Sequence, residues 1–335
     1  KFPQKNKDYQ VAVNAFRRLY HHDDGLLYVG SWAAGANVFD PKTKTLTPLQ
    51  IKNKQAKGLL SKAIGSIIRK NDHEIWITCL GGLAIYDTKL KDVTWYRLNN
   101  NVANEFYAVD HIDEANRVWH TDVNGLQYFD PVMQQFAKHS FKDLSGPDWA
   151  FAFYILSDKT GNNITVCPRW TDGLYRFDRV NQKWSKFLFP PHASFKSEKD
   201  AIRGFVQLPT GDFIISADRG IFVYSEKMKT IKLLKDELPF SVTRRGEILL
   251  DHAQNLWIAQ EEVGLIKWKP GTRQYKMYEV REPSPDTVPV ITRMTNLFED
   301  SKGNIWFQKT GGFGIYVAAE DSVRKFLYSN NESSS

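Results

Sequence analysis

Nine residues in predicted loops have side chains suited to holding a ligand, and they fall into two chemical groups. The tryptophans Trp32, Trp149 and Trp170 present flat apolar rings, which pack against the C–H face of a sugar or another flat partner. The other six are charged and mostly arginines, whose guanidinium forks suit carboxylates and sulfates: Arg169, Arg203, Arg219, Arg245, Glu261 and Arg293. We therefore predict a ligand-binding face of mixed aromatic and cationic character.

Each of these residues also has a structural interpretation. Loop tryptophans can simply cover the local part of the fold, and Arg203, Arg245 and Arg293, at the starts of predicted inner strands, can pair with neighbouring carboxylates. A net charge of +7 favours an acidic ligand, such as a uronic-acid or sulfated oligosaccharide. A nucleic acid is not expected as a partner, because lysine and arginine are spread along the chain without a concentrated run. Both interpretations stay open on the sequence.

The residues that an enzyme would need do not form a recognisable set. The sequence contains no HExxH, GxSxG, P-loop or CxxC motif. His21 and His22 lie near the end of a predicted inner strand, and His73 and His252 occupy polar turns, where histidine is unremarkable. His120 stands in an otherwise apolar strand position, which favours a core histidine. We predict no catalytic residue, no bound metal and no cofactor.

These loop residues are positioned by a repeat that runs through the chain. A glycine is followed four residues later by an aromatic residue seven times, in steps of 43 to 48 residues. The pairs are Gly35/Phe39, Gly82/Tyr86, Gly125/Phe129, Gly173/Phe177, Gly220/Tyr224, Gly264/Trp268 and Gly312/Tyr316. A period in the forties, with strands and turns in every unit, is typical of a radial β-array.

Each repeat unit reads as four short strands joined by turns. In the second unit the strands are expected at 64–69, 75–78, 83–87 and 93–98, because β-branched and aromatic residues fill these runs and Asn, Asp and Gly separate them. The predicted fold is all-β, a seven-bladed β-propeller with four antiparallel strands per blade. The loop from second to third strand and the link to the next blade emerge on one face, which carries the nine ligand-binding candidates.

The domain boundaries follow from the same units. We expect an N-terminal lead-in at 1–10, the propeller at 11–328 and a polar linker at 329–335 that leads to a downstream domain. Two ways of joining the ends of the array stay open: contact between the first and seventh blades, or pairing of 1–10 with the outer strand of the seventh. Cys79 and Cys167 fall on matching strands of separate units and are predicted to be free thiols. No apolar run of about 20 residues is present. We expect that any signal peptide was removed or lies outside this sequence.

The repeat resembles the two-component regulator propeller repeat, D-x-x-G-N-[IL]-W-[IV]-G-T-x-x-G-[LI]-x-x-[YF]-[DN]. The resemblance is carried best by 300–307 and 75–87, and it weakens where Thr165 and Ile214 replace the tryptophan. It implies the N-terminal propeller of the periplasmic sensor region of a Bacteroidetes-type hybrid two-component histidine kinase. Such a sensor would bind an oligosaccharide and pass the signal to a kinase outside this chain. Its partners would be a second propeller or protomer of the same receptor, with membrane attachment only through further segments.

Two alternatives come from other classes of protein. Streptogramin lyases and gluconolactonase-like hydrolases are propeller enzymes, whose chemistry needs a metal or a general acid and base on the axis of the ring. A bound divalent ion would favour such an enzyme. A propeller can also serve as a protein-binding scaffold, which would respond to a partner chain and not to soluble sugars.

Overall fold

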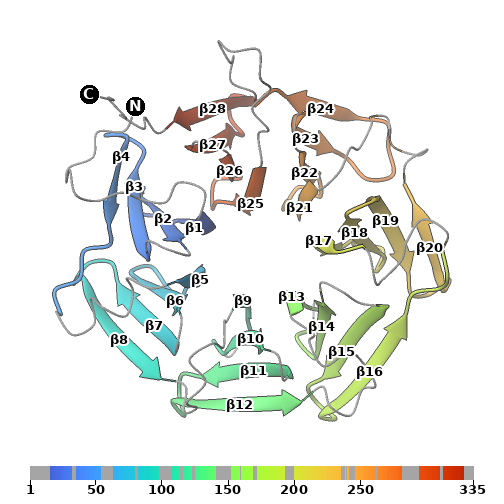
Figure 1. Ribbon diagram of the computed structural model, residues 1–335, viewed down its shortest axis with the longest axis horizontal. Helices are drawn as coiled ribbons and strands as arrows, with labels where there is room; N and C mark the ends of the chain where they lie inside the picture. The colour runs from blue at the N-terminus through green and yellow to red at the C-terminus, as the bar shows by residue number, and fades with distance from the viewer. Residues whose placement is uncertain are drawn as a thin grey trace, which may run out of the picture. The chain divides into compact units, whose positions relative to one another are not determined.

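The computed structural model consists of β-strands and turns, with no helix in the residues that it describes. These residues are 16–31, 35–53, 63–79, 82–97, 108–113, 116–122, 125–140, 152–158, 160–168, 172–192, 200–234, 238, 240, 246–260, 263–280, 294–309 and 312–327. Their strands form seven four-stranded sheets, each built from four strands that are consecutive in the sequence (Figure 1). The chain is therefore an all-β, seven-bladed β-propeller with four antiparallel strands per blade, as the sequence predicts.

The first compact unit of the chain contains the first, second and seventh blades. The first blade comprises β1 (Phe16–His21), β2 (Leu27–Ser31), β3 (Ala36–Asp40) and β4 (Thr45–Pro48). The second comprises β5 (Ile64–Arg69), β6 (Glu74–Cys79), β7 (Gly82–Asp87) and β8 (Asp92–Arg97). The seventh comprises β25 (Met294–Glu299), β26 (Ile305–Lys309), β27 (Gly312–Val317) and β28 (Ser322–Leu327).

The second compact unit contains the third to sixth blades, apart from a few residues around β23 and β24. The third comprises β9 (Ala108–Ile112), β10 (Val118–Asp122), β11 (Gly125–Asp130) and β12 (Gln135–Ser140). The fourth comprises β13 (Ala152–Ser157), β14 (Asn163–Pro168), β15 (Gly173–Asp178) and β16 (Lys183–Leu188). The fifth comprises β17 (Ile202–Gln207), β18 (Phe213–Ala217), β19 (Gly220–Ser225) and β20 (Thr230–Leu233), and the sixth comprises β21 (Gly246–Leu250), β22 (Leu256–Gln260), β23 (Gly264–Trp268) and β24 (Tyr275–Tyr278).

The turn from the third to the fourth strand has the same chemistry in several blades. Oδ1 of Asp87 accepts hydrogen bonds from the amides of Lys89 and Leu90, both at 2.8 Å. Asp178 does the same for Val180 and Asn181, both at 2.9 Å. Short aspartate side chains favour such turns because they replace a backbone acceptor. The aspartate that follows the repeat aromatic is therefore a turn residue.

The repeat glycine begins the third strand where another backbone passes close by. A Cβ at Gly173 would lie 2.2 Å from the carbonyl oxygen of Phe187 on the neighbouring strand β16. At Gly82 the corresponding distance, to the carbonyl oxygen of Tyr96, would be 2.4 Å. Both separations are shorter than any real contact, so only glycine fits at these positions.

The repeat aromatic packs against the preceding blade. In the second compact unit, the ring of Phe177 in the fourth blade lies 6.4 Å from that of Trp119 in the third blade. In the first compact unit, the ring of Phe39 in the first blade lies 5.5 Å from that of Phe313 and 5.5 Å from that of Phe326, both in the seventh blade. The first and seventh blades are therefore in direct contact, as one of the two alternatives for joining the ends of the array predicts. Residues 1–10, which the other alternative needs, lie outside the described residues.

Several remaining predictions concern the chain as a whole. Cys79 and Cys167 are both buried free thiols, as predicted, and burial raises the pKa of the Cys167 thiol. In the described part of the chain, no helix has the length and hydropathy to cross a bilayer. The predicted lead-in at 1–10 and the predicted linker at 329–335 lie outside the described residues.

Candidate functional site: a pocket between the third and fourth blades

Two of the nine predicted ligand-binding residues are described, and both are ion-paired within the fifth blade. Arg203 contacts Asp218, with Nε 2.8 Å from Oδ1 and Nη2 3.3 Å from Oδ2. Arg219 contacts the buried Asp200, with Nε 3.0 Å from Oδ1. Arg203 thus has the carboxylate partner that its structural interpretation expects, Arg219 has a partner that was not predicted, and a role for either in ligand binding stays a prediction.

The other seven predicted residues lie outside the described residues. They are Trp32, Trp149, Arg169, Trp170, Arg245, Glu261 and Arg293. That the predicted set meets at one site therefore stays a prediction, and its two described members each form an ion pair in the fifth blade.

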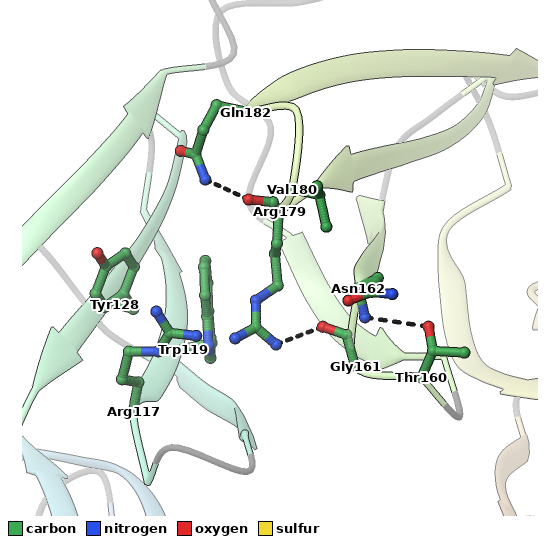
Figure 2. A pocket seen from close by; sticks show the side chains of 9 residues that line it. All are labelled: Arg117, Trp119, Tyr128, Thr160, Gly161, Asn162, Arg179, Val180 and Gln182. Atoms are coloured by element: carbon green, nitrogen blue, oxygen red, sulfur yellow. Dashed lines mark hydrogen bonds between the residues drawn. The ribbon is translucent and has the colours of Figure 1, made fainter.

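A polar pocket lies between the third and fourth blades, on turns that the sequence did not single out. Its volume is about 280 Å³. Its lining comes from the start of β10, from strand β11 and from the β13–β14 and β15–β16 turns (Figure 2): Arg117, Trp119, Tyr128, Thr160, Gly161, Asn162, Arg179, Val180 and Gln182. In a four-stranded antiparallel blade, the turns after the first and third strands leave the sheet opposite the loop after the second. The pocket therefore lies at the edge of these two blades opposite to their second-to-third-strand loops.

A buried aspartate organises the pocket. The side chain of Asp113 is 0 % exposed, and its Oδ2 accepts hydrogen bonds from Arg117 Nε and from Trp119 Nε1, both at 2.8 Å. Arg179, from the next blade, places Nη2 3.0 Å from the same oxygen. Oδ1 accepts the backbone amide of Arg117 at 3.0 Å. The charged donors compensate for burying the carboxylate, and the arrangement holds both arginines in place.

The indole of Trp119 lies between the two arginine side chains (Figure 2). The guanidinium carbon of Arg117 is 5.7 Å from the ring centroid of Trp119, and that of Arg179 is 5.5 Å away. Arg117 also lies over Tyr128, at 5.0 Å. Cation–π contacts of this kind favour the charged groups at these positions and restrict their rotation. Arg179 additionally donates from Nη1 to the carbonyl oxygen of Gly161.

The aspartate and tryptophan of this arrangement recur in other blades, but the arginine does not. In the sixth blade, Asp251 Oδ2 accepts from Trp257 Nε1 at 2.8 Å and from Asn255 Nδ2 at 2.9 Å. The seventh blade repeats this with Asp300, Trp306 and Asn304. Arg117 occupies the position of these asparagines in the third blade. This departure from the repeat is the signal in the sequence that could have identified the pocket, whereas nothing local identifies Arg179.

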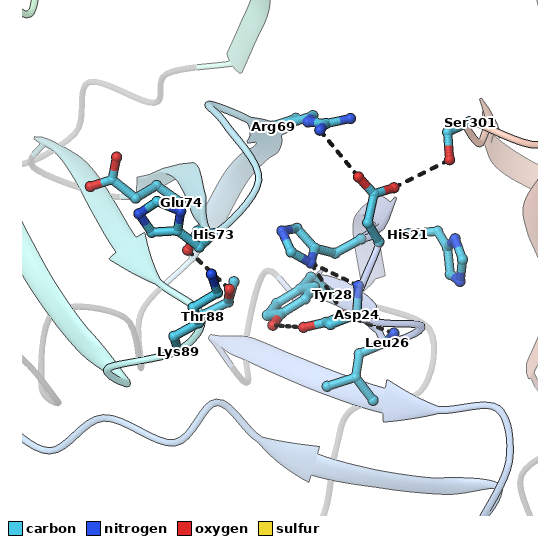
Figure 3. Close-up of polar contacts among 12 residues, drawn as sticks. His21, Asp24, Leu26, Tyr28, Arg69, His73, Glu74, Thr88, Lys89 and Ser301 are labelled. Atoms are coloured by element: carbon cyan, nitrogen blue, oxygen red, sulfur yellow. Dashed lines mark hydrogen bonds and ion pairs between the residues drawn. The ribbon is translucent and has the colours of Figure 1, made fainter.

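The histidines near the end of β1 belong to a network of structural contacts in the first unit (Figure 3). His22 Nδ1 accepts the amide of Asp24 at 3.1 Å, and Asp24 Oδ2 accepts the hydroxyl of Tyr28 at 2.9 Å. Asp23, in the same turn, lies 3.1 Å from Arg69 Nη2 and accepts the Ser301 hydroxyl at 3.2 Å. This turn therefore connects the first blade to the second and the seventh.

In the described part of the chain, no group of three or more His, Cys, Asp or Glu side chains could hold a metal ion. The backbone of His73 has a structural role, because its carbonyl oxygen accepts a hydrogen bond from the Thr88 hydroxyl at 2.9 Å. His252 is exposed in the turn between β21 and β22. The His120 side chain, like several loops on the predicted binding face, is not among those described.

Comparison with known proteins identifies the fold. No protein-family model matches the chain, and no curated protein matches it. An extracellular domain of the hybrid two component system BT3049 from B. thetaiotaomicron is similar over 90% of this chain and 40% of that chain, at 16% identity and a TM-score of 0.66. The extracellular domain of the one component system BT4673 from the same organism is similar over 94% and 47%, at 14% identity and a TM-score of 0.58. This chain thus spans less than half the length of either.

A propeller enzyme is similar as well. Virginiamycin B lyase from Staphylococcus aureus, in a structure with quinupristin, matches 90% of this chain and 94% of its own, at 13% identity and a TM-score of 0.63. Identities this low establish architecture and leave activity open. By its repeat, its sheets and these likenesses, the chain is a seven-bladed β-propeller that shares its fold with extracellular domains of bacterial signalling systems.

Proposed function

We propose that this chain is a ligand-sensing propeller from the extracellular part of a two-component sensor. The observation that supports this most directly is the likeness to the BT3049 extracellular domain, which extends over 90% of the chain. The repeat resembles the two-component regulator propeller, which agrees with that likeness. The signal would pass to a histidine kinase outside this chain, and the propeller would lie in the periplasm.

The proposed ligand is an oligosaccharide, and an acidic one fits the charge best. Support comes from the tryptophans and arginines of the predicted loops and from the net charge of +7. A propeller with well-packed blades would transmit binding as a rigid body, so the signal would depend on contact with a second propeller or protomer. The ligand site would then be shared with that partner.

A thermal-shift screen of the chain against neutral and acidic oligosaccharides tests ligand binding. A ligand that binds only the folded protein adds RT ln(1 + [L]/Kd) to its stability, about 2.7 kcal/mol at one hundred times Kd. In a full-length receptor, we expect Trp170→Ala and Arg203→Ala to impair the response to ligand without unfolding the propeller. Normal signalling by both variants would place the signalling site away from the predicted loops.

An enzymatic function is the alternative that a specific observation favours, namely the likeness to virginiamycin B lyase over 94% of that chain. Lyase or lactonase chemistry in a propeller would need a metal or an acid and base at the centre. We expect the purified protein to show no turnover of streptogramin or lactone substrates, with or without Mg²⁺ or Ca²⁺. Turnover that a chelator abolishes would favour the enzyme over the sensor.

A protein-binding scaffold is the third class. It would show no thermal shift with any sugar and a clear one with a partner chain.

A further inference from the structure

We infer that the pocket between the third and fourth blades binds the carboxylate or sulfate group of an acidic saccharide. The charge component of this inference rests on the pocket itself. The saccharide component deepens the proposed function and rests on it. Recognition would fall to Arg117, with Arg179 adding charge and the polar groups of the two neighbouring turns lining the remaining wall.

Arg117 has hydrogen-bonding capacity that the described residues do not use. A guanidinium carries five N–H groups, and in this part of the chain Arg117 donates only one of them, from Nε to Asp113. Arg176, in the same compact unit, shows the contrasting case of a guanidinium whose two outer nitrogens both have a carboxylate partner. Arg176 places Nη1 3.0 Å and Nη2 2.7 Å from the two carboxylate oxygens of Glu226. Among the residues that the structure describes, none places such a carboxylate on the outer edge of Arg117, and this arginine lines the pocket (Figure 2).

The balance of charge in the pocket favours an anion. Arg117 and Arg179 carry two positive charges, and Asp113 supplies one negative charge to both. The other lining residues are uncharged at neutral pH. An excess of one positive charge therefore remains on the lining side chains and Asp113. The nearby charge of Asp158 is engaged by donors of its own turn, from Thr160, Asn162 and Asn163. Both arginine side chains are largely buried, at 22 % and 15 % exposure, so solvent screens this charge less than it would on an open surface.

The guanidinium of Arg117 is held in place before any ligand arrives. Asp113 fixes its Nε edge, and the guanidinium carbon lies over the rings of Trp119 and Tyr128. A donor that is already ordered loses little conformational freedom on binding. The two oxygens of a planar carboxylate, or two of the terminal oxygens of a tetrahedral sulfate, match the fork that remains.

The size of the pocket restricts what can enter. A volume of about 280 Å³ lies just below the range of roughly 300–1,000 Å³ that encloses a drug-sized ligand. It suits one charged sugar unit better than a long segment. Thr160 and Asn162, on the β13–β14 turn, provide polar groups next to it. The pocket would hold a terminal or branching acidic unit, while the rest of the saccharide stays outside.

The repeat itself supplies a test variant. Arg117→Asn restores the residue found in the sixth and seventh blades, where the asparagine donates to the equivalent aspartate at 2.9 and 3.0 Å. The variant should therefore keep the Asp113 arrangement and the stability of the blade while it loses the guanidinium. Arg324→Gln is the matched control. It removes the same charge from an exposed arginine of the seventh blade, whose partner is Glu320.

Isothermal titration of the 335-residue chain would use three probes: trigalacturonic acid, its uncharged methyl ester and a 6-sulfated galactotriose. We expect at least one acidic probe to bind and the ester to bind at least about tenfold more weakly, a difference of about 1.4 kcal/mol. The acidic probe that binds better identifies carboxylate or sulfate as the group recognised. Arg117→Asn should weaken that probe by a similar factor at unchanged melting temperature, whereas Arg324→Gln should bind as the wild type does.

Three outcomes would overturn the inference. These are binding of the uncharged ester as tightly as the better acidic probe, undiminished binding of that probe by Arg117→Asn, and no binding of either acidic probe at millimolar concentration. An affinity for inorganic sulfate equal to that for the acidic saccharides would overturn the saccharide component. The proposed sensor function would survive any of these three outcomes if a neutral oligosaccharide bound equally well to Arg117→Asn and to the wild type. Absence of binding to every sugar by this chain would overturn the inference, whereas a ligand site shared with a second propeller or protomer would be tested by the response of a full-length receptor.

Discussion

Burial holds one histidine in its neutral form where the first and seventh blades meet. The His21 ring stacks on Trp306 at 5.1 Å, and its Nδ1 lies 3.5 Å from Asp300 Oδ2. Burial lowers the pKa of His21 below its ordinary value of 6.5, and the carboxylate of Asp300 opposes this shift only in part. In the unfolded chain the same histidine would take up a proton near pH 6.5.

The pH dependence of folding follows from this difference. As pH falls below about 6.5, the unfolded state binds a proton that the folded state does not yet bind, so folding stability declines. His21→Phe keeps a ring against Trp306 and removes the titration. We expect it to flatten the plot of unfolding free energy against pH between 7 and 5, by at most about 1.4 kcal/mol per pH unit. Identical slopes for wild type and variant in urea titrations would contradict this.

At the scale of the element, an aspartate joins each of several turns to the strand that follows it. Asp251 accepts the amide of Asn255 at 2.7 Å as well as the indole of Trp257 at 2.8 Å. The turn between β21 and β22 and the tryptophan of β22 are thus held by one buried carboxylate. The same arrangement explains why the repeat pattern places an aspartate six residues before the tryptophan.

Replacing this carboxylate by an amide should destabilise the protein. In Asp251→Asn, the new amide group would face the N–H groups of Trp257 and Asn255, so donors would lose their acceptor. We expect a loss of about 2–3 kcal/mol in unfolding free energy, as for charged hydrogen bonds in buried sites. Asp178→Asn is the control, because an amide oxygen can still accept the exposed turn amides of Val180 and Asn181. Equal losses in urea unfolding would show that the buried site is not special.

At the scale of the whole molecule, the contact between the first and last blades links the two ends of the array. The core there includes Leu19, Phe39, Trp306, Phe313 and Ile315, all buried. Phe39 is fully buried and touches two aromatic rings of the seventh blade. Consecutive blades elsewhere are covalently connected, whereas these two are distant in the sequence. Side-chain packing therefore carries this contact.

Phe39→Ala should weaken that contact strongly. Truncating a buried phenylalanine typically costs about 3–5 kcal/mol through lost burial and the cavity left behind. We expect this loss in denaturant unfolding, together with faster proteolysis of the first and seventh blades than of the others. Leu90→Ala, at a side chain 61% exposed, should change stability little. Uniform proteolysis along the chain would contradict a special role for this contact.

The sequence by itself determined the blades. Glycine and aromatic residues at fixed spacing, with turn-forming aspartates, are local requirements of a strand and its next turn, so they are visible in any one repeat. The strand positions were predictable for this reason, and the free thiols were predictable because Cys79 and Cys167 fall in separate repeats. The candidate arginines Arg203 and Arg219 could be found as charged groups near strand ends, but their partners Asp218 and Asp200 could not be chosen among several carboxylates.

Only the tertiary structure decided which charges meet between blades. Arg117 and Arg179 belong to different repeats, and their shared partner Asp113 looks in the sequence like an ordinary turn aspartate. Their meeting depends on how the β15–β16 turn of one blade reaches the β9–β10 turn of the preceding blade, a distance that no local pattern records. The contact between the first and seventh blades is of the same kind. Repeats encode each blade, whereas packing between blades decides where surplus charge gathers.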